Sequence, residues 1–278
     1  MRSWFFTQGH CEPTLLRIES SEMKEPSLNK EKVFVAGAAG AVGRALLPLL
    51  RAAGHEVYGS TRRAERSVGL RAAGAEPVLV DVFDAAALES ALRRIGPTAV
   101  IHQLTDLPAR ADPQLMAAAV PRNAELRRVG TANLVAAARA AGARRFVAQS
   151  IAWAYAPSPG PHREEDPLDL AAEGDRGVSV RGVQALERAS LHDAALMLGT
   201  VLRYGQLYGP GTWRDHAEGS CPVHVEAAAW AALLALRHST GGVFNIAEPG
   251  AAVDSGKARR ELGWDPSLRA GSVPGALS

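Results

Sequence analysis

Residues 33–43 read VFVAGAAGAVG, and this stretch decides the fold. A short apolar run is followed by three glycines at three-residue spacing, and the chain then continues with the amphipathic pattern of a helix. A turn this tight, whose backbone must approach a pyrophosphate, disfavours side chains, and the helix that follows aims free N–H groups at the phosphates. The alternative is that the glycines only let a strand and a helix pack closely. The pattern predicts a dinucleotide site formed by Gly37, Ala39, Gly40, Ala41, Val42 and Gly43.

The same strand–helix unit recurs along the chain. Short β-branched runs alternate with helical patterns, several of which end at a glycine such as Gly54, Gly74 or Gly142. This alternation predicts an α/β fold, a Rossmann-type doubly wound parallel sheet with a small C-terminal cap. The expected strands are 32–36, 56–60, 77–80, 98–103, 145–150 and 199–203, and the main expected helices are 41–53, 85–95, 122–141, 180–192, 225–237 and 256–262.

Three segments are expected from these patterns. Residues 1–30 lack sustained periodicity and are expected to form an N-terminal extension. Residues 31–205 are expected to form the NAD(P)-binding Rossmann domain. Residues 206–278, where the periodicity weakens, are expected to form a reduced substrate-binding cap that includes a short strand at 242–246.

The end of the second expected strand reads STRR, residues 60–63. Sites for NAD usually place a carboxylate here, where it binds the 2′-hydroxyl of the adenosine ribose. Guanidinium groups can instead form forked hydrogen bonds with the 2′-phosphate of NADP. We therefore expect Thr61, Arg62 and Arg63 to bind NADP(H), with NAD as the other possible cofactor. The alternative is that these arginines only solvate the start of the next helix.

Two further positions belong to the same expected site. Asp81 and Val82 end the third strand, which places them at the adenine edge, although Asp81 could equally be an ordinary helix-entry residue. Leu104 directly follows the fourth strand. In parallel sheets, ligands bind outside the carboxyl ends of the strands, so these residues share one edge.

Composition excludes several other classes of protein. The chain has 278 residues, with 31 Lys+Arg against 29 Asp+Glu, and its arginines are scattered, so neither nucleic acid nor a membrane is an expected partner. Two cysteines outside any metal-binding spacing favour a reducing cytoplasm. His216, Cys221 and His224 lie close together but lack a fourth ligand, so no metal is expected. We see no targeting or membrane segment, since the apolar run 230–236 is too short to span a bilayer.

The chain resembles the extended short-chain dehydrogenase/reductase superfamily, specifically its NAD(P)-dependent epimerase/dehydratase group. The resemblance rests on residues 33–43 together with GTANLVAAA (130–138), RFVAQS (145–150), LRYGQLYGPG (202–211) and KARRELGW (257–264). It implies a Tyr-x-x-x-Lys pair with a nearby Ser or Thr, in which the tyrosine is the general acid/base and the lysine lowers its pKa and holds the nicotinamide ribose. It also implies a possible homodimer.

This sequence departs from that pattern at the catalytic positions. Glu187 matches the acidic residue that usually follows the lysine by four, which places the lysine position at Val183 and the tyrosine position at Ser179. Ile151 stands where the family commonly has its catalytic Ser or Thr, and Arg127 replaces an Asn commonly found three residues before Gly130.

Other residues are candidates for the missing chemistry. Tyr155 lies just past the fifth strand, at the edge where ligands bind, and Ser150 ends that strand, so we expect these two as the catalytic residues. Tyr204 and His102 are further candidates. Each of the aromatic residues could instead be a packed side chain whose polar atom merely finds a partner.

The sequence therefore favours an NADP-dependent oxidoreductase or epimerase acting on a small carbonyl, hydroxyl or sugar-like substrate. The alternative is a redox-silent relative that serves as a lyase, isomerase or cyclase, or as a nucleotide-sensing binding protein. The cap also looks shorter than is usual in the family, which predicts an unusually open substrate pocket, or one closed by a neighbouring subunit or by the N-terminal extension.

Overall fold

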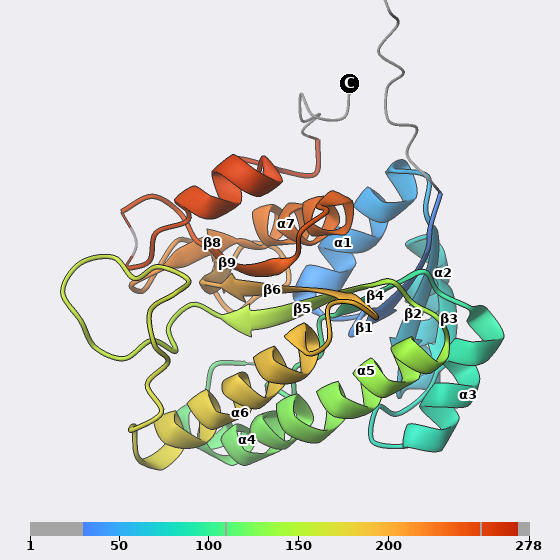
Figure 1. Cartoon of the computed structure of the whole chain (residues 1–278), viewed down its shortest axis with the longest axis horizontal. Helices are drawn as coiled ribbons and strands as arrows, with labels where there is room; N and C mark the ends of the chain where they lie inside the picture. Colours follow the sequence, from blue (N-terminus) through green and yellow to red (C-terminus); the bar gives the residue numbers. More distant parts are fainter. Residues whose placement is uncertain (1–29, 109, 251, 272–278) are drawn as a thin grey trace, which may run out of the picture.

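The computed structural model describes residues 30–108, 110–250 and 252–271, and contains a parallel sheet with helices on both faces (Figure 1). Its strands are β1 (Lys32–Ala36), β2 (Glu56–Thr61), β3 (Glu76–Leu79), β4 (Ala99–His102), β5 (Arg145–Ile151), β6 (Leu198–Tyr204) and β9 (Gly242–Ile246), and β7 (Gln206–Tyr208) and β8 (Pro222–His224) form a separate pair. The helices are α1 (Ala41–Ala52), α2 (Ser67–Ala72), α3 (Ala85–Ile95), α4 (Pro113–Glu125), α5 (Thr131–Ala140), α6 (Gly174–Leu191) and α7 (Val225–Arg237), with the short segments η1 (Ala64–Arg66), η2 (Leu126–Gly130) and η3 (Ala258–Leu262). The expected extension, residues 1–30, lies outside the described residues except for Lys30.

The strand order is β3-β2-β1-β4-β5-β6-β9, so the chain winds outward from β1 in one direction and from β4 in the other. This confirms the doubly wound α/β sheet expected from the sequence. The winding reverses between β1 and β4, which pair in parallel with Ala36 opposite His102. In such sheets the crevice outside the carboxyl ends of these two strands is where ligands bind.

Local sequence signals start and stop the helices. Asp84 accepts a hydrogen bond from the N–H of Ala87 (2.9 Å) and caps α3, and Gly96 ends that helix in the left-handed conformation (φ 62°). Gly54, which follows α1, also has a positive φ, 83°. These caps explain why the predicted bounds of α3 match the structure.

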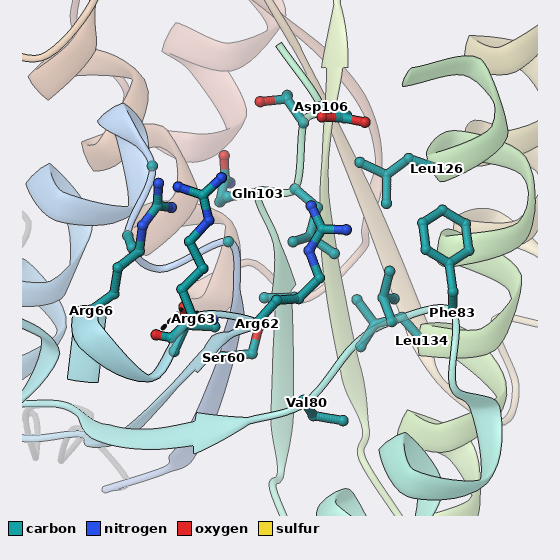
Figure 2. A pocket seen from close by; sticks show the side chains of 18 of the residues that line it. Ser60, Arg62, Arg63, Arg66, Val80, Phe83, Gln103, Asp106, Leu126 and Leu134 are labelled. Carbon is teal, nitrogen blue, oxygen red and sulfur yellow. Dashed lines mark hydrogen bonds between the residues drawn. The ribbon is translucent and has the colours of Figure 1, made fainter. Parts of the chain in front are cut away.

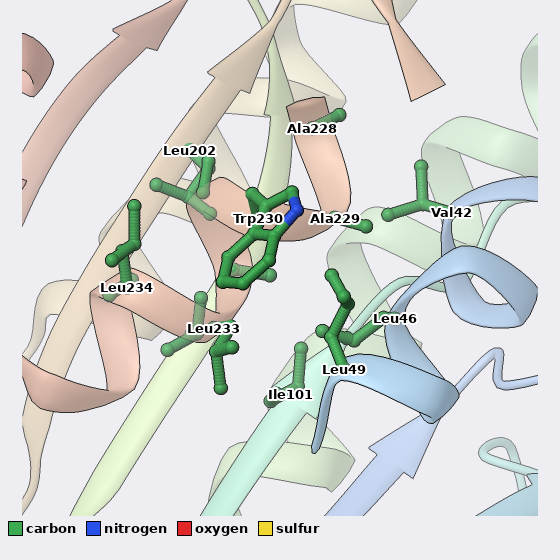
Figure 3. Packing of buried hydrophobic residues seen from close by; sticks show 14 of the residues in the cluster. Val42, Leu46, Leu49, Ile101, Leu202, Ala228, Ala229, Trp230, Leu233 and Leu234 are labelled. Atoms are coloured by element: carbon green, nitrogen blue, oxygen red, sulfur yellow. The ribbon is translucent and has the colours of Figure 1, made fainter. Parts of the chain in front are cut away.

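Two apolar layers enclose the sheet. One layer lies under α3, α5 and α6 and includes Leu92, Leu134 and Leu186. The other lies under α1, α2 and α7, and Trp230 of α7 packs there against residues of α1 and the sheet (Figure 3). Burial of this magnitude on both faces holds the strands in register.

The C-terminal part of the chain differs from the prediction. Residues 242–246 were expected in the cap, but they form β9, which pairs in parallel with β6, and α7 packs against α1. Much of the segment 206–278 thus completes the core of the Rossmann sheet, and β7, β8 and the adjoining loops are what remains as a cap. Periodicity along the chain could not show this, because the strand pairs with a partner distant in sequence.

Two helices are longer than predicted. The long helix expected at 122–141 begins at Pro113 and continues through η2 into α5, because Asp112 caps its start and Pro121 does not end it. The helix expected at 180–192 begins at Gly174. Within the described ranges, no helix is long and apolar enough to cross a membrane.

We expect Trp230→Ala to lower the free energy of unfolding by about 3–5 kcal/mol, because the indole is buried and its Nε1 donates to the carbonyl of Arg269 (2.8 Å). Trp213→Ala is the control, since that indole is 36% exposed, and it should cost about 1 kcal/mol or less. Urea unfolding followed by circular dichroism measures both. Equal losses would show that α7 is not part of the main core.

Candidate functional site

A crevice opens at the carboxyl ends of β1 to β4, where the winding of the sheet reverses. Its wall includes the glycine turn after β1, the arginines after β2, the residues after β3 and the loop after β4 (Figure 2). The sequence predicted a ligand site at this edge. The crevice is therefore the place where the predicted cofactor residues can be tested against geometry.

The three glycines of the turn have different roles. A Cβ on Gly37, whose φ is 85°, would lie 2.5 Å from the carbonyl oxygen of Gln103, and a Cβ on Gly43 would lie 2.5 Å from that of Ala38. Both are needed for packing, as the alternative interpretation held. Gly40 differs, because a Cβ there would meet only the carbonyl oxygen of Gly37 at 3.2 Å. Gly40 is exposed and lines the crevice, so its backbone can approach a pyrophosphate.

The start of α1 is also suited to a phosphate. Gly40 is the N-cap, no side chain caps the helix, and its first turn contains no acidic residue. The first N–H groups of a helix have no partner within the helix, and they carry its partial positive charge. Arg44 donates to the carbonyl oxygen of Ala39 (2.8 Å) and so ties the turn to the helix. The residues present fit a dinucleotide pyrophosphate.

Three arginines extend into the crevice from the end of β2 and from η1: Arg62, Arg63 and Arg66 (Figure 2). Arg62 makes a loose ion pair with Asp81 (3.8 Å), and its side chain is 58% exposed. No ion pair involves the other two within the described part of the chain. Such a group of partly free guanidiniums fits a phosphate better than a ribose hydroxyl.

The opposite wall of the crevice is apolar. Phe83, Leu126 and Leu134 face the arginines across the opening (Figure 2), and Val82 also lines the crevice. A flat apolar slot beside the end of β3 suits an adenine ring. Phe83 was not predicted, although its place directly after Val82 was a usable signal, and Arg66 was missed although it lies one short helical turn after Arg63.

The structure brings most of the predicted cofactor residues together, but not all. Asp81 does not line the crevice, because its Oδ1 accepts the N–H of Phe83 (3.0 Å) in a turn, as the helix-entry alternative held. Thr61 lines it, but its hydroxyl accepts the N–H of Arg63 (3.1 Å). The lining set includes Gly37, Ala39, Gly40, Thr61, Arg62, Arg63, Val82 and Leu104, whereas Ala41, Val42, Gly43 and Asp81 lie outside it.

Ser150 belongs to a buried ion-pair network. Its hydroxyl donates to Oε1 of Glu187 (2.7 Å), and the same carboxylate accepts two hydrogen bonds from Arg203, from Nε at 2.9 Å and from Nη2 at 2.7 Å. All three residues are buried. The network joins β5, β6 and α6, and it leaves the Ser150 hydroxyl no free hydrogen to give to a substrate.

Tyr155 joins the same network. Its hydroxyl donates to Oδ1 of Asn245 (2.7 Å) and accepts from Nη1 of Arg203 (2.7 Å). Burial raises the pKa of Tyr155 to about 12, against the lowering effect of the Arg203 charge. Neither Tyr155 nor Ser150 lines the crevice. Their catalytic role stays a prediction, and this geometry does not favour it.

The positions of the implied Tyr–Lys pair hold no acid/base group. Val183 is fully buried and packs with Ile151, Ala154 and Val180, and Ser179 is half-buried. An apolar cluster thus stands where the family resemblance implied the lysine and the serine. Aliphatic side chains can exclude water there, but they cannot move a proton.

The two remaining candidates are also held in the protein. His102 is fully buried between Oγ1 of Thr131 (2.9 Å from Nε2) and the N–H of Leu104 (3.1 Å from Nδ1), and burial lowers its pKa to about 4. Tyr204 accepts from Nε2 of Gln103 (3.3 Å), and burial raises its pKa. At neutral pH both are uncharged packing residues. No group of three possible metal ligands occurs among the described residues.

Comparison with known proteins gives the chain its relatives. The model of the NAD dependent epimerase/dehydratase family matches residues 33–263. A protein described as a 3-diazoavenalumate denitrifying reductase, from a Streptomyces species, is 42% identical over 240 residues, which is 78% of this chain and 76% of that protein.

Solved structures share the fold. UDP-glucose 4-epimerase of Thermotoga maritima, solved with UDP-glucose, superposes with a TM-score of 0.68 at 19% identity, covering 88% of this chain and 96% of its own. The dTDP-glucose 4,6-dehydratase of Streptomyces venezuelae, solved with NAD, gives 0.68 at 19% identity, covering 85% and 92%. At such low identity these likenesses show the fold alone.

We expect Gly40→Asp to abolish dinucleotide binding while the fold survives, because the new carboxylate would face the phosphates from an exposed position where a Cβ meets only the carbonyl oxygen of Gly37, at 3.2 Å. Gly40→Ala is the control and should bind only modestly more weakly. NADPH fluorescence measures binding, and circular dichroism measures folding. If Gly40→Asp bound NADPH as tightly as the wild type, the assignment of the pyrophosphate to this turn would be wrong.

Proposed function

Because the chain belongs to the NAD-dependent epimerase/dehydratase family, we propose that it is an NADP(H)-dependent reductase that works without a tyrosine proton donor. The observation that carries this proposal is the apolar cluster of Val183, Ile151, Ala154 and Val180, which occupies the implied lysine and Ser/Thr positions, while Ser179 occupies the implied tyrosine position. The cofactor crevice retains its phosphate-binding turn, whereas the proton-transfer residues are replaced. Hydride chemistry that needs no general acid is compatible with both facts.

The choice of NADP(H) rests on charge. Family membership and the relatives solved with NAD support an NAD(P) cofactor, and the arginines at the end of β2 favour the form with a 2′-phosphate. Arg62, Arg63 and Arg66 would hold that phosphate, the turn at Gly40 the pyrophosphate and Phe83 the adenine. When bound, the reduced cofactor would supply a hydride.

The replacement of the implied tyrosine and lysine by Ser179 and Val183 restricts the kinds of substrate that the protein could reduce. Reduction of a carbonyl leaves an alkoxide that needs a proton, and epimerisation through a ketone also needs a base. A diazonium carbon needs neither, because the new C–H bond forms from the hydride while the C–N bond breaks and its electron pair leaves with N₂. We propose as the substrate an acid that reacts as a diazonium ion, by analogy with the relative named for 3-diazoavenalumate.

In this reaction the residues of the chain act by holding and by excluding water. Val183 and Ile151 keep the region behind the reacting centre dry. The Glu187–Arg203 pair fixes β5 against β6 and α6. A dry site also protects a diazonium from attack by water.

The second candidate is a redox-silent protein that binds NADP(H) as a ligand. This function is favoured by the same observation, that Ser179 and Val183 stand where the family resemblance implied the tyrosine and the lysine. The two functions differ in one observable, which is turnover of the nucleotide.

We expect 3-diazoavenalumate to be reduced, with loss of absorbance of NADPH and release of one N₂ for each NADPH oxidised. Tyr155→Phe should retain most of this activity, because its hydroxyl is not needed as an acid, and it should differ mainly in stability. Tight binding of NADPH without any oxidation would support the redox-silent function. Loss of turnover in a well-folded Tyr155→Phe would restore the tyrosine as the acid.

We expect Arg62→Ala and Arg66→Ala each to weaken NADPH binding about 10- to 100-fold and to leave NADH binding nearly unchanged, since a charged hydrogen bond to the phosphate is lost. Arg71→Ala, at an exposed position of α2 outside the crevice, is the matched control. Fluorescence titration with both nucleotides measures this. Equal weakening of the two would contradict a 2′-phosphate site.

A further inference from the structure

Arg127 is a buried arginine for which the described residues supply no hydrogen-bond or ion-pair partner. It lies in η2 and is 7% exposed. Its guanidinium makes no hydrogen bond or ion pair with any residue in the described ranges. Its guanidinium nitrogens are not fully buried either, so the small exposed part of the side chain includes the guanidinium. The guanidinium of Arg127 can therefore be reached by a small molecule, and no described residue binds it.

The direction of Arg127 follows from its neighbours on the helix. Asn123, Arg127 and Thr131 are spaced by four residues and so share one face. Asn123 accepts the N–H of Asp106 (3.0 Å), and Thr131 contacts Nε2 of His102 (2.9 Å). Arg127 therefore faces the carboxyl end of β4, between these two contacts. Its neighbour Leu126 lines the crevice, but Arg127 itself does not, so the guanidinium lies beside the crevice.

The charges around Arg127 do not balance. Glu187 is the nearest acid that influences it, but that carboxylate is already held by both the forked Arg203 and Ser150. His102 is neutral at pH 7, since its pKa is about 4. Burial lowers the pKa of Arg127 to about 10, so it stays charged at neutral pH. The cluster of two arginines and one glutamate thus keeps one excess positive charge, and buried charges in proteins are normally paired.

We propose that Arg127 binds an oxyanion of the substrate at the carboxyl end of β4, beside the crevice. This inference rests on the proposed reductase function, and it names the chemistry that the substrate must carry, a carboxylate or a phenolate. A guanidinium binds such groups through two parallel hydrogen bonds and so fixes their plane as well as their position. The implied lysine position on α6 holds the apolar Val183, so in this proposal the positive charge that meets the substrate comes instead from Arg127 in η2.

The test measures binding of anionic probes to the complex with NADP⁺, so that it does not depend on turnover. 4-Hydroxycinnamate is compared with its methyl ester for the carboxylate, and 4-nitrophenolate with 4-nitroanisole for the phenolate, by calorimetry. Wild-type protein should prefer at least one anion over its neutral partner by about 10- to 100-fold. Arg127→Met should lose that preference, and Arg127→Lys should keep part of it. Arg128→Met is the matched control, because Arg128 is exposed and pairs with Glu125 (2.8 Å).

Thermal unfolding without ligand gives a second readout. Arg127→Met removes an unpaired buried charge but keeps the apolar stem, so we expect the Tm to rise by roughly 2–8 °C. Retention of the anion preference by Arg127→Met, no preference in the wild type, or failure of Arg127→Met to fold would each overturn the proposal.

The two proposals can fail separately. Turnover of 3-diazoavenalumate, with an anion preference that does not depend on Arg127, would refute the oxyanion site alone. An anion preference that is lost in Arg127→Met, in a protein that never oxidises NADPH, would refute the reductase alone.

Discussion

The backbone of Gly37 lies so close to the backbone of Gln103 that no side chain fits between them, and this contact fixes the position of the crevice. It joins the turn after β1 to the end of β4, at the point where the winding of the sheet reverses. The start of α1 therefore lies at the crevice, where no side chain caps its first N–H groups and Gly40 is part of the lining. The arginines after β2 and the apolar wall after β3 line the same crevice as this turn.

The other half of the sheet has lost its usual chemistry while keeping its structural support. Glu187 and Arg203 still pair, and Ser150 and Tyr155 complete their hydrogen bonds. A buried ion pair of this geometry is costly to break but contributes little net stability, so its main effect is to fix β5, β6 and α6 relative to one another. Tyr155 illustrates the consequence, because its hydroxyl donates to Asn245 and accepts from Arg203, a geometry that does not favour the predicted catalytic role.

The sequence predicted what depends on local signals and missed what depends on distant pairing. The glycine turn, the capped helix α3 and the helix α7 could be read directly, since their signals lie within a few residues. The place of β9 in the main sheet could not, because its apolar run does not specify which strand it joins. The same holds for Tyr155, which was predicted at the ligand-binding edge because it follows β5. Its hydroxyl accepts from Arg203, a residue remote in sequence, and no local pattern could show this.

The exchange of a lysine position for Val183 and of an asparagine position for Arg127 changes where positive charge acts, and this bears on the direction of the chemistry. Hydride delivery with loss of N₂ lowers the charge of the substrate by one. In a dry site, where Coulomb interactions are much stronger than in water, a fixed cation stabilises a step that adds negative charge. An excess positive charge beside the crevice, as proposed for Arg127, would therefore favour hydride acceptance by the substrate over the reverse reaction. A lysine that tunes a tyrosine would serve proton transfer in both directions, whereas an unpaired Arg127 serves only the substrate that brings its own anion.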